Sequence, residues 1–455
     1  MTMNPNLKFC LTRAAGFLVA ALTIPTALAA GDPFQPAHKL VGLPHDSGFP
    51  DGHDTWNAMG CASDGNIYYV LSAEKHDVGA RMFCFAPKQN RIRFVGDLTE
   101  ACGEKGRNSV VQGKSHVNFV EHGGKLYFAT HAGFYSIVNG METMGIPPAG
   151  WQPYPGGHLL AYDLKSGKFE DFGLAPDREG ILTFNMDTRR GRGFYLTWPS
   201  GQFVRFNFAT RDAKNFGRTC ALGEAATGAE YRTVCRSIAV NPEDGSAYYS
   251  TSEGDIFRYR ADTDSVAKVA GENLKKDYFG LYDPTSPGHM GYNWRQTFWR
   301  PADQMIYAVH GNSGYLFRFD PKSERIQVLE RITAEPSKAS GMFDQFSYGY
   351  LGFDLARDGR TIYYLTGGAI YENGKRLAGK ASTAMGEAKG LENVHLVTYD
   401  IAKRQYRDRG AISYPDGRRP IYVNSLAIGH DGTAYFIARI NENGHTRSDL
   451  ISVKL

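Results

Sequence analysis

This sequence lacks several features that would point to a membrane protein, a helical repeat or a common enzyme class. After residue 30, no apolar stretch approaches the ~20 residues that a membrane-spanning helix needs. No segment repeats apolar residues with the period of a helix, and the Gly-rich phosphate loop, H-E-x-x-H and G-x-S-x-G are absent. These absences argue against a helical repeat, and we expect no membrane span once the N-terminal segment is removed.

The chain has nearly equal numbers of basic and acidic side chains. Its 455 residues include 51 Lys and Arg against 47 Asp and Glu, a formal net charge of +4. Nucleic-acid binding would call for basic residues clustered on one face, so we expect no nucleic acid partner. The 42% of hydrophobic residues is enough to bury a core, which excludes a disordered chain. The 26 Tyr, 27 Phe and 52 Gly are typical of short strands joined by tight turns.

The first thirty residues have the pattern of a secretory signal peptide. Lys8 and Arg13 flank the polar start, residues 14–27 are mostly apolar, and Ala27-Leu28-Ala29 supplies a small-x-small cleavage pattern. A permanent N-terminal anchor is the alternative. We expect cleavage after residue 30, a mature chain of residues 31–455, and a secreted or periplasmic location.

Cysteine is scarce, and an exported chain is free to form disulfides. Of the six cysteines, only Cys10 lies in the expected leader. Cys220 and Cys235 lie close in sequence on either side of a Gly/Ala-rich loop, and we expect them to pair. Metal ligation is the competing interpretation, although no C-x-x-C spacing supports it.

A Tyr-rich strand pattern recurs seven times, each time after a turn. Strands of alternating pattern at a regular interval indicate radial repetition of small sheets. The strands are residues 65–70, 124–130, 193–197, 245–251, 305–309, 361–366 and 433–437. The sequence therefore predicts an all-β fold, a seven-bladed β-propeller formed by residues 31–455 as one domain.

Each Tyr-rich strand follows a short apolar strand, which is the innermost of its blade. These first strands begin at intervals of about 54 to 73 residues, longer than the ~40–50 usual for propeller repeats. The excess belongs to loops, and six or eight blades stay open as alternatives. The last unit has three strands, so we expect residues 37–42 to supply its fourth strand and close the ring.

The first-strand starts and the turns after the second strands share one face of such a ring. Rings of Trp and Tyr stack on sugars, whereas Arg and His attract anions, so this face suits an acidic carbohydrate. The residues that we expect to bind substrate there are Trp56, Asn57, Trp198, Trp294, Arg295, His310, Tyr350 and Asn424. Glu253 is the one carboxylate expected on this face, which argues against a glycosidase pair.

His116 and His131 are the strongest candidates for chemistry. His116 opens the first strand of the second blade and His131 ends the neighbouring antiparallel strand, which brings the two side by side. Two imidazoles in one place can transfer protons or hold a metal ion, and the alternative is that they only bond loop carbonyls. His158 is a third member if its insert folds inward. Tyr195, in register with Tyr249, is interpreted as a packing residue.

Three short motifs resemble the seven-bladed propeller polysaccharide lyases, especially the bacterial ulvan lyases. They are Gly113-Lys-Ser-His116, Tyr127-Phe-Ala-Thr-His131 and Leu196-Thr-Trp198-Pro-Ser-Gly201. The resemblance implies cleavage by β-elimination beside a uronic acid, with two histidines, a tyrosine and an arginine at the site. Sulfated, ulvan-like polymers are among the substrates that it suggests. His116 and His131 match the histidine pair.

The same resemblance leads us to expect further catalytic residues. Arg236 is the choice for neutralising the substrate carboxylate, and Tyr231 or Tyr278 for donating or accepting a proton. No organic cofactor is required, while a metal ion held by His and Cys side chains is compatible with the site. The partner is then an acidic polysaccharide, and we expect a monomer.

Two other functions stay open. One is a non-catalytic envelope propeller that binds glycans or a protein. The other is a metal-dependent lactonase-type propeller, which would use ligands such as Asn57, Glu253 and Asn424. The arginines expected on the same face argue against a cation there.

Overall fold

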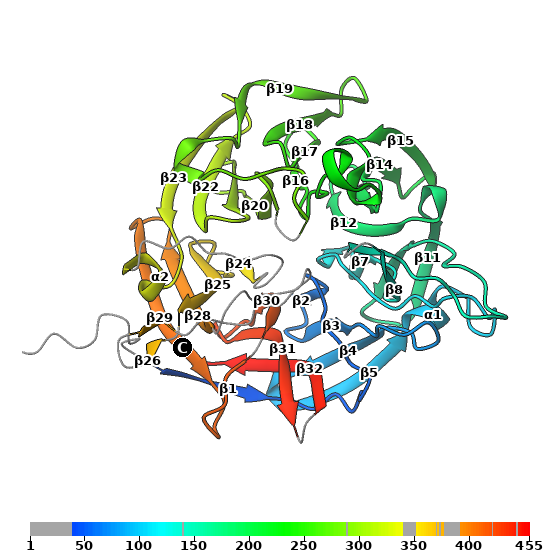
Figure 1. The fold of residues 1–455 in the computed structure, drawn as a ribbon, viewed down its shortest axis with the longest axis horizontal. Helices are drawn as coiled ribbons and strands as arrows, with labels where there is room; N and C mark the ends of the chain where they lie inside the picture. The colour runs from blue at the N-terminus through cyan, green and yellow to red at the C-terminus, as the bar shows by residue number, and fades with distance from the viewer. Residues whose placement is uncertain are drawn as a thin grey trace, which may run out of the picture.

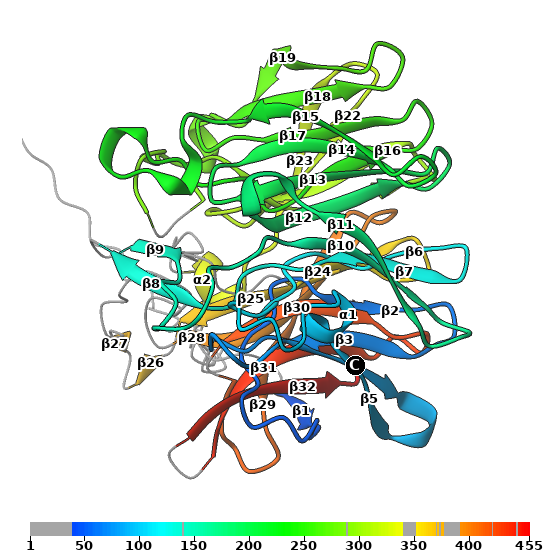
Figure 2. The ribbon, with the colours of Figure 1, turned by 90° about the vertical axis from the view of Figure 1, so that its right-hand side faces the viewer.

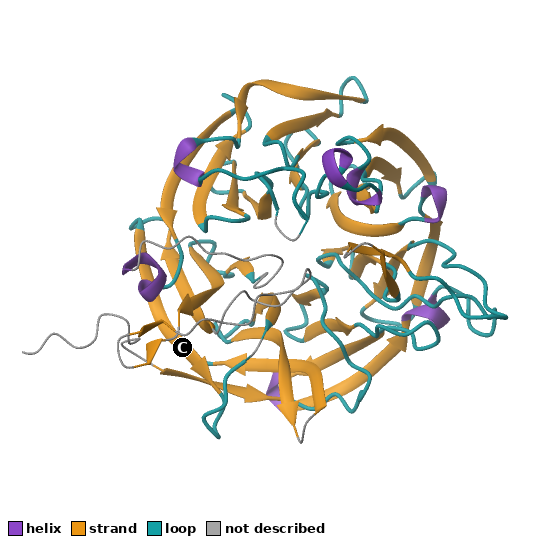
Figure 3. Cartoon of the chain, in the orientation of Figure 1, coloured by secondary structure: helices purple, strands orange, loops and turns teal. Residues whose placement is uncertain are grey.

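The computed structural model describes residues 39–455, except 139–140, 288–289, 340–351, 370, 373–374, 377–391, 421 and 443–444. Strands make up 51% and helices 6% of the described residues, which confirms the predicted all-β class (Figure 3). The expected leader and Tyr350 lie outside the described residues. In the described part of the chain, no helix is long and apolar enough to cross a membrane.

Five sheets have four antiparallel strands each. In sheet order they are β2 (Met59–Cys61), β3 (Ile67–Leu71), β4 (Arg81–Ala86) and β5 (Arg91–Asp97); β6 (Val120–His122), β7 (Lys125–Ala129), β10 (His158–Asp163) and β11 (Phe169–Leu174); β12 (Gly180–Asp187), β13 (Arg192–Trp198), β14 (Gln202–Asn207) and β15 (Asp212–Arg218); β16 (Ala239–Asn241), β17 (Ser246–Ser250), β18 (Asp255–Arg260) and β19 (Ser265–Asn273); β20 (Trp294–Arg300), β21 (Met305–His310), β22 (Tyr315–Asp320) and β23 (Arg325–Arg331).

A larger sheet joins the C-terminal strands to the first strand of the described chain. Its order is β24 (Phe353–Leu355), β25 (Thr361–Ala369), β28 (Glu392–Asp400), β29 (Gln405–Ser413), β1 (Lys39–Pro44), β32 (His445–Val453), β31 (Ala434–Glu442) and β30 (Val423–Ile428). Lys39–Val41 pair in parallel with β29, and Gly42–Pro44 pair antiparallel with β32. The β1 strand therefore covers an edge of the four strands β24, β25, β28 and β29 and, at the same time, adds a fourth strand to β30, β31 and β32.

Short hairpins and helical turns decorate these sheets. The hairpins are β8 (Tyr135–Val138) with β9 (Met141–Met144), and β26 (Tyr371–Glu372) with β27 (Lys375–Arg376). The helices are α1 (Leu98–Ala101), α2 (Glu335–Ala339), η1 (Pro87–Gln89), η2 (Pro176–Arg178), η3 (Gly223–Ala225), η4 (Gly228–Glu230) and η5 (Asp277–Phe279).

The sheets are arranged radially about a central axis, as in a propeller (Figure 1). The short strands β2, β16, β24 and β30 lie nearest the axis, and inner strands of neighbouring groups contact one another. The β8–β9 and β26–β27 hairpins project from the same side of the sheets (Figure 2). The fold is thus propeller-like, and both of these hairpins lie on the same side of it.

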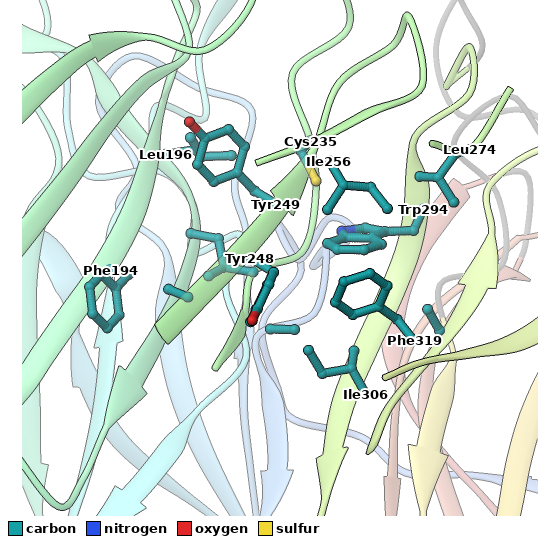
Figure 4. Packing of buried hydrophobic residues seen from close by; sticks show 14 of the residues in the cluster. Phe194, Leu196, Cys235, Tyr248, Tyr249, Ile256, Leu274, Trp294, Ile306 and Phe319 are labelled. Carbon is teal, nitrogen blue, oxygen red and sulfur yellow. The ribbon is translucent and has the colours of Figure 1, made fainter. Parts of the chain in front are cut away.

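The Tyr-rich strands supply the core between the sheets. Tyr68, Tyr195, Tyr248 and Tyr307 are each at most 2% exposed, in agreement with the packing role predicted for Tyr195. Trp294 belongs to the same core: its indole lies between Ile256 and Phe319 (Figure 4), and its Nε1 donates to the Ser237 carbonyl at 2.9 Å.

The cysteines do not form the expected pair. Cys61, Cys84, Cys102, Cys220 and Cys235 are all free thiols. Cys235 Sγ lies 3.3 Å from the Ser250 hydroxyl and 3.2 Å from the Ser237 carbonyl, so polar contacts with its own sheet replace the predicted disulfide.

A side-chain latch recurs on the third strand of four blade-like groups. The first residue of that strand, or in β28 its fourth residue, His395, contacts a residue 13 positions later on the next strand, beside a break in the register of pairing. The latches are His158–Asp171, Gln202–Asn215, Asp255–Lys268 and His395–Asp408. The spacing is constant while the chemistry changes, so the latch is a geometric feature of the repeat.

The His158 latch has two carboxylate partners. Its Nδ1 donates to Asp171 at 2.9 Å and its Nε2 to the buried Glu104 at 3.0 Å. Burial disfavours the charged imidazole, but the hydrogen bonds to Asp171 and Glu104 outweigh it and raise the pKa of His158 to about 9. The insert that carries Glu104 is thereby fixed to β10 and β11.

We expect His158→Gln to lower the free energy of unfolding by about 2–4 kcal/mol at pH 7, because a buried carboxylate loses its cation. The stabilisation by charged His158 is complete below pH 6.5 and is lost as the pH rises through about 9. Urea unfolding at pH 6, 7.5 and 9.5 measures this. The double variant His158→Gln/Asp171→Asn, which copies the Gln202–Asn215 latch, is expected to recover part of the loss. An equal difference at all three pH values would contradict the role of charge.

Candidate functional site

A cluster of cationic and aromatic side chains gathers where β7, β8, β13 and the segment before β16 meet. We call it the central cluster; its members are Trp56, Lys114, His116, His131, Tyr135, Trp198, Glu224 and Arg236. Contacts among these residues run without a break from Trp56 to Arg236. The predicted histidine pair lies at its centre.

Backbone pairing brings the two histidines together. Lys114 and His131 exchange both backbone hydrogen bonds, N to O, at 3.1 and 2.7 Å. The imidazole centroids of His116 and His131 are 5.6 Å apart, with the rings nearly perpendicular at 87°. His131 also packs against Gly180, where a Cβ would stand 1.9 Å from its Nδ1. Position 180 therefore has no room for a side chain.

His116 is held in one tautomer. Its Nδ1 lies 2.9 Å from the Leu182 carbonyl, which can only accept, so Nδ1 carries the proton and Nε2 keeps a lone pair. Its ring stacks on Trp56 with centroids 5.7 Å apart and planes 4° from parallel. Burial, with His131, Arg236, Lys114 and Arg295 around it, keeps the pKa of His116 well below its usual value. His116 is thus a neutral imidazole whose Nε2 keeps an unprotonated lone pair.

The surroundings of His131 favour the opposite tautomer. Its Nδ1 has no hydrogen-bond partner among the described residues. A buried N–H without an acceptor is rare in proteins, so this nitrogen is the bare one and the proton is on Nε2. Burial and the nearby Lys114 and Arg236 keep the pKa of His131 well below its usual value.

Lys114 brings one positive charge into the cluster. Its Nζ donates to the Tyr135 hydroxyl at 2.9 Å, lies 3.8 Å from the centre of the Trp56 ring and approaches Glu74 to 3.9 Å. Burial lowers the pKa of Lys114. The Tyr135 hydroxyl in turn donates to the Ala132 carbonyl at 2.5 Å.

Arg236 brings a second charge, and Glu224 fixes its position. The Arg236 guanidinium lies 2.7 Å from Glu224 Oε1 and donates to the Val234 carbonyl at 2.9 Å. Glu224 also accepts from Trp198 Nε1 at 2.9 Å, and the Trp198 ring meets the His131 ring edge-on at 5.4 Å. Glu224 and Trp198 therefore connect Arg236 to His131.

Further polar side chains join inner segments that are far apart in the sequence. The Gln296 amide donates to Asn57 Oδ1, joining inner segments 239 residues apart, and Asn424 accepts from the Thr55 N–H at 3.3 Å. A cavity of about 330 Å³ lies beside Asn57, Thr183, Arg236 and Thr297. Arg295 is buried and approaches Met290 Sδ to 3.1 Å. Of the predicted positions, Asn57 and Arg236 line this cavity.

Other predicted residues lie elsewhere. Trp294 is in the core, where no ring face is left for a ligand. His310 is fully buried, stacks on Phe279 at 4.3 Å and bonds Ser313; burial lowers its pKa to about 3. Tyr278 is 45% exposed on η5, against Phe279 and Tyr315.

Tyr231 is buried beside η4 and shares a hydrogen bond with Thr233. Tyr135 is a tyrosine that meets His131, with 6.5 Å between the ring centres. Glu253 forms an ion pair with Arg232, and His158 belongs to its latch.

Sequence reasoning missed Lys114, Tyr135 and Glu224. Lys114 stands two residues before His116 and pairs with His131, so alternation along an extended segment was a usable signal. Tyr135 begins the β8–β9 insert, which belongs to no repeat, and Glu224 lies in a loop. Among the described residues, no group of three or more His, Cys, Asp or Glu is placed to hold a metal ion.

Comparisons with known proteins add little about function. No family model matches the chain, and no curated protein matches it. A comparison of structures matches a chain of "Crystal Structure of Mitotic Checkpoint Complex" with a TM-score of 0.47 and 10% sequence identity. The match covers 98% of this chain and 99% of that chain.

We expect His116 and His131 to stay neutral well below pH 6.5, because burial and cationic neighbours disfavour the imidazolium. Nitrogen-15 NMR of labelled protein, assigned with His116→Gln and His131→Gln, measures both titration and tautomer. We expect protonated Nδ1 in His116 and protonated Nε2 in His131. Titration of either ring near pH 6.5, or the same tautomer in both, would contradict this description.

Proposed function

We propose that residues 31–455 form one seven-bladed β-propeller, which β1 closes. Five four-stranded sheets and two further groups of four strands, counted with β1 as the fourth strand of the last, support this count. We further propose that residues 1–30 are a cleaved leader and that the mature monomer is secreted or periplasmic.

We propose that the central cluster is the active site of a polysaccharide lyase acting on a uronic-acid-containing, ulvan-like polymer. The observation that carries the proposal is a pair of buried imidazoles 5.6 Å apart, whose pKa values burial and the nearby Lys114 and Arg236 keep low. A β-elimination needs this combination: a base for a carbon-bound proton, and cations for the adjacent carboxylate.

The reaction breaks the bond from C4 of the uronate to the glycosidic oxygen. His116 Nε2 takes the proton from C5, the electron pair forms the C4–C5 double bond, and the leaving oxygen takes a proton from a second group. Arg236, with Lys114 near it, stabilises the negative charge that develops on the carboxylate. No organic cofactor enters these steps.

Two predicted tyrosines have no such role in this proposal. Tyr278 stands on η5 against Phe279, and Tyr231 is buried beside Thr233. Trp56, partly exposed and stacked on His116, is the aromatic ring best placed to meet a sugar.

The test is the absorbance of unsaturated uronate after incubation with ulvan, glucuronan, pectate and glycosaminoglycans. We expect turnover on at least one polymer, and a loss of about 100-fold or more in His116→Ala and Arg236→Ala. Exposed His122→Ala and Arg91→Ala are matched controls that should keep full activity.

Because Arg236→Ala leaves Glu224 buried without its cation, thermal unfolding of every variant accompanies the assay, and Arg236→Lys separates charge from fold. Turnover retained by a folded His116→Ala or Arg236→Ala removes that residue from the mechanism. No product from any polymer, with binding retained, would instead favour a non-catalytic glycan-binding propeller.

A further inference from the structure

The proposed elimination leaves one proton without a donor. His131 is a neutral imidazole, whose N–H is a very weak acid. Tyr135 already donates its proton to the Ala132 carbonyl, and burial raises the pKa of Tyr135 far above its usual value. The leaving oxygen therefore needs another acid near the cluster.

The β8–β9 hairpin carries a carboxyl group on the appropriate face. Tyr135 pairs with Met144 and Ile137 with Glu142, so these four side chains project from one face of the hairpin. That is the face on which Tyr135 reaches Lys114. Glu142 is the diagonal neighbour of Tyr135, one step further along the hairpin, and the hairpin projects from one side of the sheets (Figure 2).

The charged groups around Glu142 come from four separate segments. Lys114 and Arg236 attract its charge, whereas Glu74 and Glu224 repel it. No ion pair or hydrogen bond within the described residues uses the Glu142 side chain, although all the other charged members of this group are bonded. A half-buried carboxyl group among these residues is thus available to a ligand.

We propose that Glu142 is the general acid that protonates the leaving glycosidic oxygen. This inference rests on the proposed lyase function and names a catalytic residue that neither the repeat pattern nor the resemblance indicates.

Proton transfer then balances within the site. The C5 proton goes to His116 Nε2, the C4–O bond breaks as the C4–C5 double bond forms, and the carboxyl proton of Glu142 goes to the departing oxygen. Water afterwards carries a proton from His116 back to Glu142. Burial raises the pKa of Glu142 to about 7; Glu74 and Glu224 add to this effect, whereas Lys114 and Arg236 oppose it. The protonated carboxyl group is therefore present near neutral pH.

The decisive variant is Glu142→Gln, which keeps the shape of the side chain and removes the transferable proton. We expect it to lower turnover of the polymer by about 100-fold or more. A uronide with fluoride at C4 needs no protonated leaving group, so the variant should process it within about threefold of the wild type. His116→Ala should fail on both substrates.

Exchange of the C5 proton in heavy water provides a second readout. Glu142→Gln should still exchange it, because the base and the cations are intact, whereas His116→Ala should not. This exchange also reports that the site of the variant is folded. Glu142→Asp keeps the acid and should recover part of the turnover, while Thr143→Val on the opposite face of the hairpin is the matched control.

The outcomes separate the two proposals. If wild-type protein cleaves a uronate polymer and Glu142→Gln does so at a similar rate, Glu142 is not the acid and the lyase function stands. If Glu142→Gln loses fluoride elimination and C5 exchange together with cleavage, its role is structural and the inference fails. If wild-type protein cleaves no polymer and eliminates no fluoride, the lyase function fails and the inference fails with it.

Discussion

The buried carboxylate of Glu224 holds the central cluster in its arrangement. It accepts from Arg236, from the Trp198 indole and from the Val234 N–H. Trp198 ends β13, Arg236 precedes β16, and η3 presents Glu224 between them. A guanidinium buried without such a partner would carry a large desolvation cost. One side chain in a loop therefore sets both the charge beside the histidines and the ring against which His131 packs.

Rigid neighbours then determine what each histidine can do. His116 is oriented by a carbonyl of β12 and by the Trp56 ring, and His131 by the bare Cα of Gly180. These restraints come from β12, which carries both the Leu182 carbonyl and Gly180, and from the segment before β2, which carries Trp56, so neither imidazole can turn without moving one of these segments. Such positioning on regular elements is what a site needs to keep a productive geometry. These different surroundings also make the two imidazoles chemically distinct, although both belong to histidines.

Much of the fold follows from the sequence, whereas the site follows only in part. Alternating Tyr-rich strands predict the sheets, and a hairpin places His116 beside His131. Alternation also places Trp294 near the start of an inner strand. It does not show whether the side chain points to the central axis or into the core between sheets, and the indole lies in the core. The 13-residue latch escapes detection because His–Asp, Gln–Asn and Asp–Lys pairs share geometry and no chemistry. Tyr135 and Glu142 lie in an insert, where no repeat predicts their direction.

In the proposed reaction, the charges of the cluster couple substrate binding to basicity. Arg236 and Lys114 are among the groups that keep the pKa of His116 low in the unliganded protein. A uronate carboxylate bound between them would offset part of their field, and a nearby anion favours the protonated imidazole. His116 would then become a stronger base when the carbon acid is in place. A neutral sugar would supply no such change, so selectivity for acidic polymers would arise from the base itself as well as from contacts with the carboxylate.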